Sequence, residues 1–390
     1  MAGCGCNCCF AAAGPGHPSL VQLMPYDIAI DASRTTVARV TGTEHYAHRL
    51  ISGLIDLNNT LEQPHRLSLY FRDAPAGDLF PASDHTTYHV IPFPRLWTHL
   101  RFAAALVQHR PDVTFVPAHT LPFVFPGRSV VTIHDLGYLR FPQAHPTRQR
   151  AYLDLTTRYS ANRASLILAD SQATADDLHA FYRVNPTKIR VVYPGVDVPS
   201  AGEGLHLSAK YGIPNSYLVF IGTLQPRKNI ERLIRAFTHW KRSNPDSEVG
   251  LVLAGGKGWL FDEAWLADVE GVYLTGYIDE ADKGSLLRRA MGMVFPSLYE
   301  GFGFPVVEAM HVGTPVIASN TSSLPELVAD AGIQIDPLDE DALISAIDLL
   351  VSHADLRQSL REKGYQQAAQ FTWEQAAQQT LDALVAAASS

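Results

Sequence analysis

Short apolar runs alternate with amphipathic, helix-like stretches along most of the chain. In the first half, strands are expected at residues 26–31, 66–72, 86–93, 112–118, 129–135, 166–171 and 189–193. In the second half they are expected at residues 217–222, 249–254, 272–275, 293–297, 315–319 and 333–336, while residues 339–388 show only helical patterns. Strands that alternate with helices form parallel sheets covered by helices on both faces. The pattern therefore predicts an α/β protein built from doubly wound, Rossmann-like domains.

A stretch rich in proline and glycine, residues 194–204, lies between the two sets of strands and is the expected linker. The predicted organisation is a disordered Cys-rich extension at residues 1–24, an N-terminal domain at 25–194, a linker at 195–212, a C-terminal domain at 213–370 and a C-terminal helix at 371–390 that can return to the N-terminal domain. Two facing domains of this kind would enclose an interdomain cleft at the carboxyl ends of both sheets.

Composition limits the classes of function. A formal net charge of -8 argues against general nucleic-acid binding, because such binding needs a basic surface. No apolar run approaches the roughly 18 residues of a membrane span, so a soluble protein is expected. All cysteines lie at the start of the chain, so the fold is expected to use no disulfide and to suit a reducing cytoplasm. A metal-binding or lipidated cluster is the alternative for Cys4, Cys6, Cys8 and Cys9.

The most informative stretch joins an apolar run to a helix at residues 295–310. It carries two carboxylates, Glu300 and Glu308, with Gly301, Gly303 and Pro305 between them. Proline suits the first turn of a helix, where its missing N–H costs nothing. The glycine-rich turn would present free N–H groups at the positive end of the helix dipole. Two carboxylates beside such a turn suit a ligand that is both anionic and rich in hydroxyls, such as a sugar joined to a nucleoside diphosphate.

A second turn from strand to helix, at residues 219–230, carries Arg227 and Lys228. Solvated surface charge is one interpretation of this pair. However, cations at a helix N-terminus oppose the helix dipole, so a bound anion accounts for them better. An arginine fork and a lysine point charge together can hold a diphosphate.

Three further positions carry weaker signals. His134, together with Asp135, ends a predicted strand and would face the cleft, although a lone histidine is usually structural. Gly42 precedes an apparent helix and could let the backbone approach a ligand. Gly255 and Gly256 follow a strand, and this turn would approach a nucleotide or would only pack a helix on the sheet.

Residues 95–110 form an amphipathic helical pattern with Leu96, Leu100, Ala103, Ala104 and Val107 on one stripe. We expect this stripe to pack on the core and the arginines to face solvent. Contact with a membrane surface or an anionic acceptor is the alternative.

Taken together, these motifs resemble the retaining glycosyltransferases of the GT-B fold, specifically glycosyltransferase family four. The resemblance runs from about residue 26 to the C-terminus and leaves out the Cys-rich start. Glu300 and Glu308 are similar to the family's E-x(7)-E pair. Residues 131–136, 220–230 and 251–259 look most like the bacterial mannosyltransferase branch. One departure is Thr43-Glu44-His45, where the commoner form is Gly-Ile-Gly-Arg.

The resemblance implies a role for each matching residue. Arg227 and Lys228 would hold the diphosphate, and Glu308 would accept hydrogen bonds from the ribose. Glu300 and the N–H groups around Phe302 and Gly303 would meet the transferred sugar. The remaining expected contacts are His134 beside the sugar and a donor-binding set that adds Gly42, Gly222, Thr223, Gly255, Gly256, Ile278 and Gly301.

The implied activity is transfer of a hexose, with mannose from GDP-mannose as the first choice, to a glycan, a lipid-linked or a small-molecule acceptor. A UDP- or dTDP-sugar donor, or a non-catalytic nucleotide-sugar-binding protein, are the alternatives. No metal, cofactor or nucleic acid is expected. The protein is expected in the cytoplasm, with a weak peripheral contact at the inner face of the membrane as an option.

Overall fold

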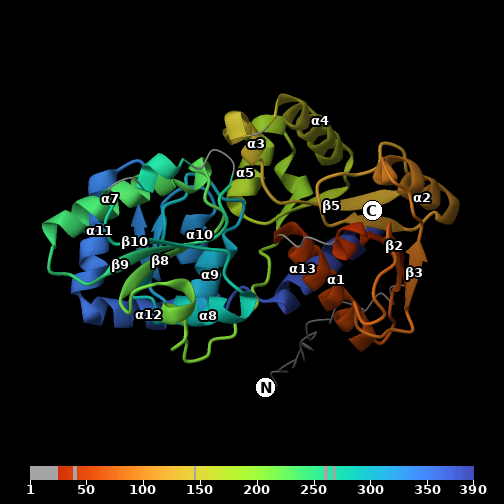
Figure 1. Cartoon of the computed structure of the whole chain (residues 1–390). Helices are drawn as coiled ribbons and strands as arrows, with labels where there is room; N and C mark the ends of the chain where they lie inside the picture. Colours follow the sequence, from red (N-terminus) through yellow and green to blue (C-terminus); the bar gives the residue numbers. More distant parts are fainter. Residues whose placement is uncertain (1–24, 38–41, 145, 259–261, 267–268) are drawn as a thin grey trace, which may run out of the picture.

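The computed structural model describes residues 25–37, 42–144, 146–258, 262–266 and 269–390. The Cys-rich extension expected at residues 1–24 lies outside the described residues. Figure 1 shows two α/β domains side by side, with one sheet in each. Every strand pair in both sheets is parallel.

The N-terminal sheet has the strand order β3-β2-β1-β4-β5-β6-β7. Its strands are β1 (Asp27–Asp31), β2 (Arg66–Phe71), β3 (Thr86–Val90), β4 (Val113–Val116), β5 (Arg128–Ile133), β6 (Leu166–Ala169) and β7 (Ile189–Val191). Its helices are α1 (Gly42–Thr60), the π-helix η2 (Thr98–Phe102), α2 (Ala103–His109), α3 (Gly137–Arg140), α4 (Thr147–Arg163) and α5 (Gln172–Tyr182). Short 3-10 turns are η1 (Ser33–Thr36), η3 (Pro142–Ala144) and η4 (Pro186–Lys188).

The C-terminal sheet has the order β10-β9-β8-β11-β12-β13. Its strands are β8 (Tyr217–Ile221), β9 (Gly250–Ala254), β10 (Val272–Gly276), β11 (Gly292–Phe295), β12 (Val316–Ser319) and β13 (Gly332–Ile335). The helices after the linker are α6 (Leu207–Tyr211), α7 (Ile230–Ser243), α8 (Glu280–Arg289), α9 (Phe304–His311), α10 (Leu324–Val328), α11 (Glu340–Ser352), α12 (Ala354–Ala368) and α13 (Trp373–Ala388), with 3-10 turns η5 (Pro226–Lys228) and η6 (Glu263–Leu266).

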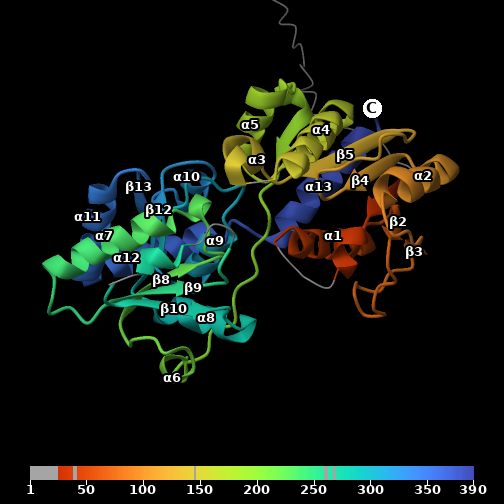
Figure 2. The same cartoon turned by 45° about the horizontal axis from the view of Figure 1, so that its top comes forward.

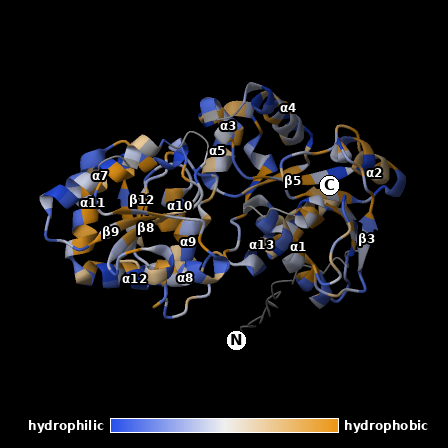
Figure 3. Cartoon of the chain, in the orientation of Figure 1, coloured by the Kyte–Doolittle hydropathy of each residue, from blue (hydrophilic) through white to orange (hydrophobic). Residues whose placement is uncertain are grey.

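The sheet orders confirm the predicted doubly wound α/β class, and each predicted strand forms. In both sheets the order reverses beside the first strand, which places a ligand crevice at the carboxyl ends of the neighbouring strands. The apolar colour in Figure 3 concentrates on the strands and on the helix faces turned toward them. Buried parallel strands need such continuous apolar sequences because helices cover both of their faces.

Strand ends are where the sequence prediction was too generous. β5 ends at Ile133, so His134 and Asp135 belong to the following loop. β3 ends at Val90, short of the predicted residue 93, and Pro92 cannot donate a hydrogen bond to a neighbouring strand.

The stripe expected to pack on the core at residues 95–110 is the clearest error. Leu96, Leu100 and Val107 are 61%, 51% and 47% exposed. The buried face is formed instead by Phe102 and Leu106, which are fully buried in the core of the N-terminal domain. A π-helical first turn shifts the register, so a simple helical period points to the wrong face.

The last helix crosses from one domain to the other. Helix α13 packs along α1 and joins the N-terminal hydrophobic core through Trp373, Leu381 and Leu384, as Figure 2 shows. The chain passes the domain boundary twice at one place, where the N–H of Val196 donates to the carbonyl of Phe371 at 3.0 Å. No helix among the described residues is long and apolar enough to cross a membrane.

One glycine at the cleft edge is required by the backbone itself. Gly255 has φ +150°, and a β-carbon there would lie 2.1 Å from the carbonyl oxygen of Gly222. Gly255→Ala should therefore lower the free energy of unfolding by about 2 kcal/mol or more, through strain and the forced separation of two loops. Gly256→Ala is the matched control, because nothing lies within 4 Å of its added carbon. Urea midpoints measure both variants, and equal midpoints would contradict the prediction.

Candidate active site

Arg227 and Lys228 lie on the 3-10 turn η5, between β8 and α7. The turn is closed by Asn229, whose φ of 60° lies in the left-handed region that asparagine tolerates better than most residues. The Asn229 side-chain amide donates to the carbonyls of Pro296 at 3.1 Å and Pro337 at 2.7 Å. These bonds fix the turn against the loops that follow β11 and β13.

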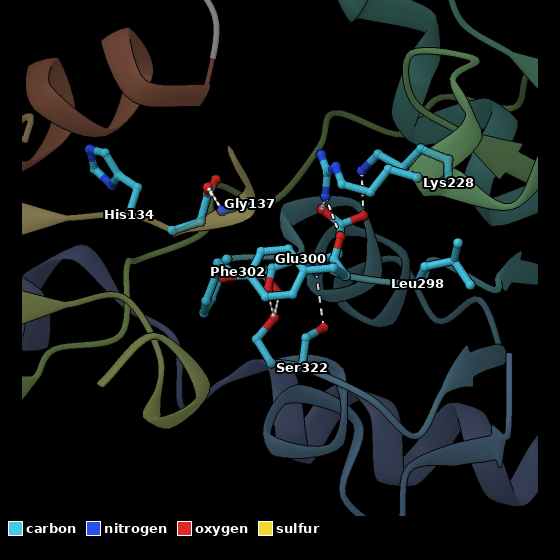
Figure 4. Close-up of polar contacts among 12 residues, drawn as sticks. His134, Gly137, Lys228, Leu298, Glu300, Phe302 and Ser322 are labelled. Atoms are coloured by element: carbon cyan, nitrogen blue, oxygen red, sulfur yellow. Dashed lines mark hydrogen bonds and ion pairs between the residues drawn. The ribbon is translucent and has the colours of Figure 1, made fainter. Parts of the chain in front are cut away.

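Glu300 is the partner of both cations. Lys228 Nζ lies 2.5 Å from Glu300 Oε1, and Arg227 Nη1 lies 3.0 Å from Glu300 Oε2. Figure 4 shows Lys228 directed at Glu300 from the facing loop. All three side chains are largely buried. Burial works to raise the pKa of Glu300, but the Lys228 and Arg227 charges outweigh it and hold that pKa at about 2. The cluster therefore carries a net positive charge that an anionic ligand can meet.

The loop from Glu300 to α9 presents backbone donors. The N–H of Glu300 donates to Ser322 Oγ at 3.0 Å. The N–H groups of Gly301, Phe302 and Gly303 have no acceptor among the described residues. Gly303 has φ +121° and precedes α9, which carries Pro305 in its first turn as predicted. Free N–H groups at a helix N-terminus favour an anion or a sugar oxygen.

Glu308 lies further along α9 and has one free oxygen. Its Oε1 accepts from Lys283 Nζ at 2.6 Å, whereas the buried Oε2 has no hydrogen-bond partner. Burial raises the pKa of Glu308, and the Lys283 charge only partly offsets this. A buried acceptor without a partner is costly to maintain, and a ligand hydroxyl would satisfy it.

His134 stands apart from this cluster. Its Nδ1 lies 2.7 Å from Asp170 Oδ2, and its Nε2 lies 3.0 Å from the carbonyl oxygen of Pro117. In Figure 4 the ring turns away from Lys228 and Glu300. Burial alone would lower the pKa of His134, but the Asp170 carboxylate raises it above its ordinary value. The imidazole thus favours the charged form, in which both nitrogens donate, and it places a positive charge on the N-terminal side of the cleft.

The other residues expected at the site lie around the mouth of the C-terminal sheet. Gly222 and Gly255 both have positive φ and lie against each other at the ends of β8 and β9, with Thr223 and Gly256 exposed beside them. Ile278 is packed in the hydrophobic core after β10. Gly42 is the exposed first residue of α1. The His45 charge on that helix affects the pKa of Glu308, so the start of α1 and helix α9 approach each other.

Sequence reasoning missed several residues that hold these groups in place. Lys283, Asp170 and Ser322 each bond a predicted residue from a distant part of the chain. Tyr299 was also missed: its hydroxyl accepts from the N–H of Leu136 at 3.1 Å and donates to Asp177 at 2.9 Å, both in the other domain. Only Tyr299 had a signal, because it lies next to Glu300.

Within the described ranges, no three His, Cys, Asp or Glu side chains gather in a way that could hold a metal ion. What the arrangement offers instead is a cation pair, free backbone donors and a free carboxylate oxygen within one domain. This combination can bind a diphosphate together with hydroxyl groups.

Comparison with known proteins agrees with this chemistry. The model described as Glycosyltransferase Family 4 matches residues 40–199, and the model described as Glycosyl transferases group 1 matches residues 208–367. O-antigen chain mannosyltransferase B of Escherichia coli is 32% identical over 299 residues, which are 74% of this chain and 78% of that protein. The chain belongs to glycosyltransferase family 4.

A second relative of this glycosyltransferase, D-inositol 3-phosphate glycosyltransferase of Stackebrandtia nassauensis, is 32% identical over 234 residues. That match covers 56% of this chain and 53% of the relative, about half the length of each. Among solved structures, Anabaena HepE in complex with UDP-glucose has a TM-score of 0.69 at 18% identity, covering 93% of this chain and 100% of the other. The likeness confirms the GT-B fold of the enzyme.

The buried ion cluster makes stability depend on pH. Because the folded-state pKa of Glu300 is about 2, below its ordinary 4.5, the contribution of this group is fully present above pH 4.5 and is lost as the pH falls toward 2. Glu300→Gln leaves two buried cations without their partner and should cost on the order of 3 kcal/mol at pH 7. The difference from wild type should narrow at pH 3. Urea midpoints at both values measure this, and a constant difference would contradict the assignment.

Proposed function

We propose that the enzyme is a retaining mannosyltransferase that moves mannose from GDP-mannose to a hydroxyl of a glycan, lipid-linked or small-molecule acceptor. The observation that carries this proposal is the set of unsatisfied groups in the C-terminal domain: the positive cluster at Arg227 and Lys228, the free N–H groups before α9, and the free Oε2 of Glu308. A nucleotide sugar has one group for each of them.

In the proposed complex, Arg227 and Lys228 hold the diphosphate and share their charge between it and Glu300. Glu308 accepts from the ribose through Oε2, while Lys283 keeps its other oxygen engaged. Glu300 and the N–H groups of Phe302 and Gly303 meet the phosphate and the sugar hydroxyls. The turns at Gly222–Thr223 and Gly255–Gly256, with Ile278 and Gly42, complete the donor site.

The proposed reaction takes place on one face of the sugar. An acceptor oxygen bonds to the anomeric carbon while the bond from that carbon to the phosphate oxygen breaks. The acceptor's proton passes to the leaving phosphate oxygen, so charge balances without a protein nucleophile, a metal or a cofactor. Arg227, Lys228 and the positive end of α9 stabilise the phosphate as it leaves, and one such preorganised donor is typically worth ~3–4 kcal/mol.

The donor choice is supported by one relative. O-antigen chain mannosyltransferase B is named as a mannosyltransferase and is similar to this chain over most of its length. The alternative donors are UDP- and dTDP-sugars, and HepE, which shares the fold, binds UDP-glucose. A donor screen separates these alternatives and also tests the non-catalytic one.

The screen compares GDP-mannose with UDP- and dTDP-sugars by thermal shift and by slow release of the nucleotide. A donor at 100 times its Kd should add ~2.7 kcal/mol of stability. We expect GDP-mannose to stabilise the enzyme and to release GDP slowly, and both effects should be weaker in Glu308→Gln. Glu280→Gln is the control, because Glu280 also contacts Lys283 but is 77% exposed. Stabilisation by a UDP- or dTDP-sugar alone would replace the donor, and binding without release would favour a non-catalytic protein.

A surface of the N-terminal domain supports the proposed contact with the inner face of a membrane. Its exposed apolar side chains come from η2, α4 and the loop between β4 and β5: Leu96, Leu100, Phe123, Val124, Tyr152 and Leu155. His99 joins the three segments, stacking on Phe123 at 4.1 Å and lying 3.4 Å from the Tyr152 hydroxyl. Arg95, Arg101, Arg148 and Arg158 are exposed on the same segments.

This surface is basic on a chain that is acidic overall. Residues 94–110 and 119–130 contain no Asp or Glu, although the net charge is -8. Apolar groups bordered by arginines fit the anionic headgroups and acyl boundary of a membrane, where a lipid-linked acceptor would lie.

Co-sedimentation with vesicles tests the membrane contact. The wild type should bind vesicles rich in phosphatidylglycerol more strongly than vesicles of phosphatidylcholine. Because each arginine contributes about 1 kcal/mol near such a surface, Arg101→Glu should weaken binding about tenfold or more. Arg242→Glu, an exposed site on α7 in the other domain, should have little effect. Equal binding by the two variants would contradict the assignment of this surface.

A further inference from the structure

Helix α5 of the N-terminal domain is capped by a carboxylate from the C-terminal domain. The N–H of Gln172 donates to Oε2 of Glu326 at 2.7 Å, and the N–H of Ala173 donates to Oε1 at 2.8 Å. Glu326 lies on α10, on the other side of the domain boundary in Figure 1 and Figure 2. A carboxylate that accepts the first N–H groups of a helix also meets the positive end of its dipole.

The same carboxylate reaches the hinge. Tyr193 follows β7, next to the linker, and its hydroxyl donates to Glu326 Oε2 at 2.9 Å. Burial and the Glu326 charge raise the pKa of Tyr193 to about 12, so the phenol remains a donor throughout the physiological range. Glu326 thus joins three donors from two segments of the opposite domain.

The capped end of α5 also contacts both halves of the active site. Ser171, the N-cap residue, donates its hydroxyl to the carbonyl of Gly301 at 2.7 Å. Thr174 donates to the carbonyl of His134 at 3.1 Å. Where these two loops meet, a β-carbon on Gly301 would lie 2.4 Å from the His134 carbonyl oxygen. A displacement of α5 relative to α10 would therefore separate the Glu300 loop from the loop that carries His134.

We propose that Glu326 is a positioning residue that latches the two domains in the closed arrangement in which sugar transfer occurs. The latch comprises the Glu326 carboxylate, the N–H groups of Gln172 and Ala173, and the Tyr193 hydroxyl. It can open at low cost, because water can take over the N–H groups of a helix N-terminus when the domains separate. The effect on turnover rests on the proposed glycosyl transfer, whereas the effect on domain separation does not.

The donor groups and the latch are separate in space and in role. Arg227, Lys228 and Glu308 all belong to the C-terminal domain, so opening the latch leaves their mutual contacts intact. Loss of the latch should accordingly lower kcat while the Kd and KM for the donor stay close to wild type. A merely structural defect would weaken donor binding as well.

Two variants break the latch from opposite sides. Glu326→Ala removes the carboxylate. Gln172→Pro removes one donor, because proline lacks an N–H but fits the first position of a helix, and the preceding Ser171 is already extended at φ −156° and ψ 162°. The control is Gln172→Ala, which keeps the N–H and loses only the surface bond to Asp176. A second control, Asp330→Asn, removes an exposed ion pair with Lys363.

Small-angle X-ray scattering of the ligand-free protein is measured first, together with thermal unfolding to confirm folding. Both latch variants should show a larger radius of gyration than wild type, and both controls should match wild type. In transfer assays, kcat should fall by up to about 100-fold, as expected when reacting groups are displaced by an ångström or so. The double variant should be no worse than either single one, because both remove the same contact.

Wild-type scattering and wild-type kcat in Gln172→Pro would overturn the latch, even if Glu326→Ala failed to fold. An expanded latch variant combined with no sugar transfer by the wild type would support the latch and overturn the proposed function instead.

Discussion

Burial of one ion cluster is the constraint on which the cleft depends. Glu300 cannot be placed in a dry interdomain site unless Arg227 and Lys228 meet both of its oxygens. Those cations can reach it only because Asn229 adopts a left-handed conformation and because the glycine-rich loop brings the carboxylate back toward β8. The unusual backbone angles of the site therefore serve to bring charges together. Once they are together, the excess positive charge defines where an anionic substrate binds.

Much of the fold and half of the site could be predicted from the sequence, for identifiable reasons. Parallel strands buried on both sides must be apolar throughout, so their positions were visible without a structure. The spacing of Glu300 and Glu308 and the charges at Arg227 and Lys228 were visible because each motif lies on one short turn. Lys283 and Asp170 were not visible, since each meets its partner only after distant segments pack together. The exposed Leu96 and Leu100 show a further limit: periodicity reveals a stripe but not the direction in which it faces.

The two halves of the enzyme differ in how much chemistry they disclose. In the C-terminal domain, the groups without partners correspond to the phosphate, ribose and sugar of a donor. In the N-terminal domain, His134 is fully engaged with Asp170 and Pro117, so its ring offers charge rather than a hydrogen bond to an acceptor. Next to it, burial and the His134 charge lower the pKa of His119 to about 4. Acceptor recognition thus depends on surface shape and electrostatics, which are harder to trace to single residues.

The placement of α13 has a consequence for biosynthesis. Because this helix covers the apolar side of α1, the N-terminal domain includes residues from both ends of the described chain, with the entire C-terminal domain synthesised between them. During translation, Ile51, Leu54 and their neighbours on α1 must therefore wait, uncovered, until α13 leaves the ribosome. The C-terminal domain folds first as an independent unit, and its completion brings the last helix to the place where it is needed. The domain translated first is the one that finishes folding last.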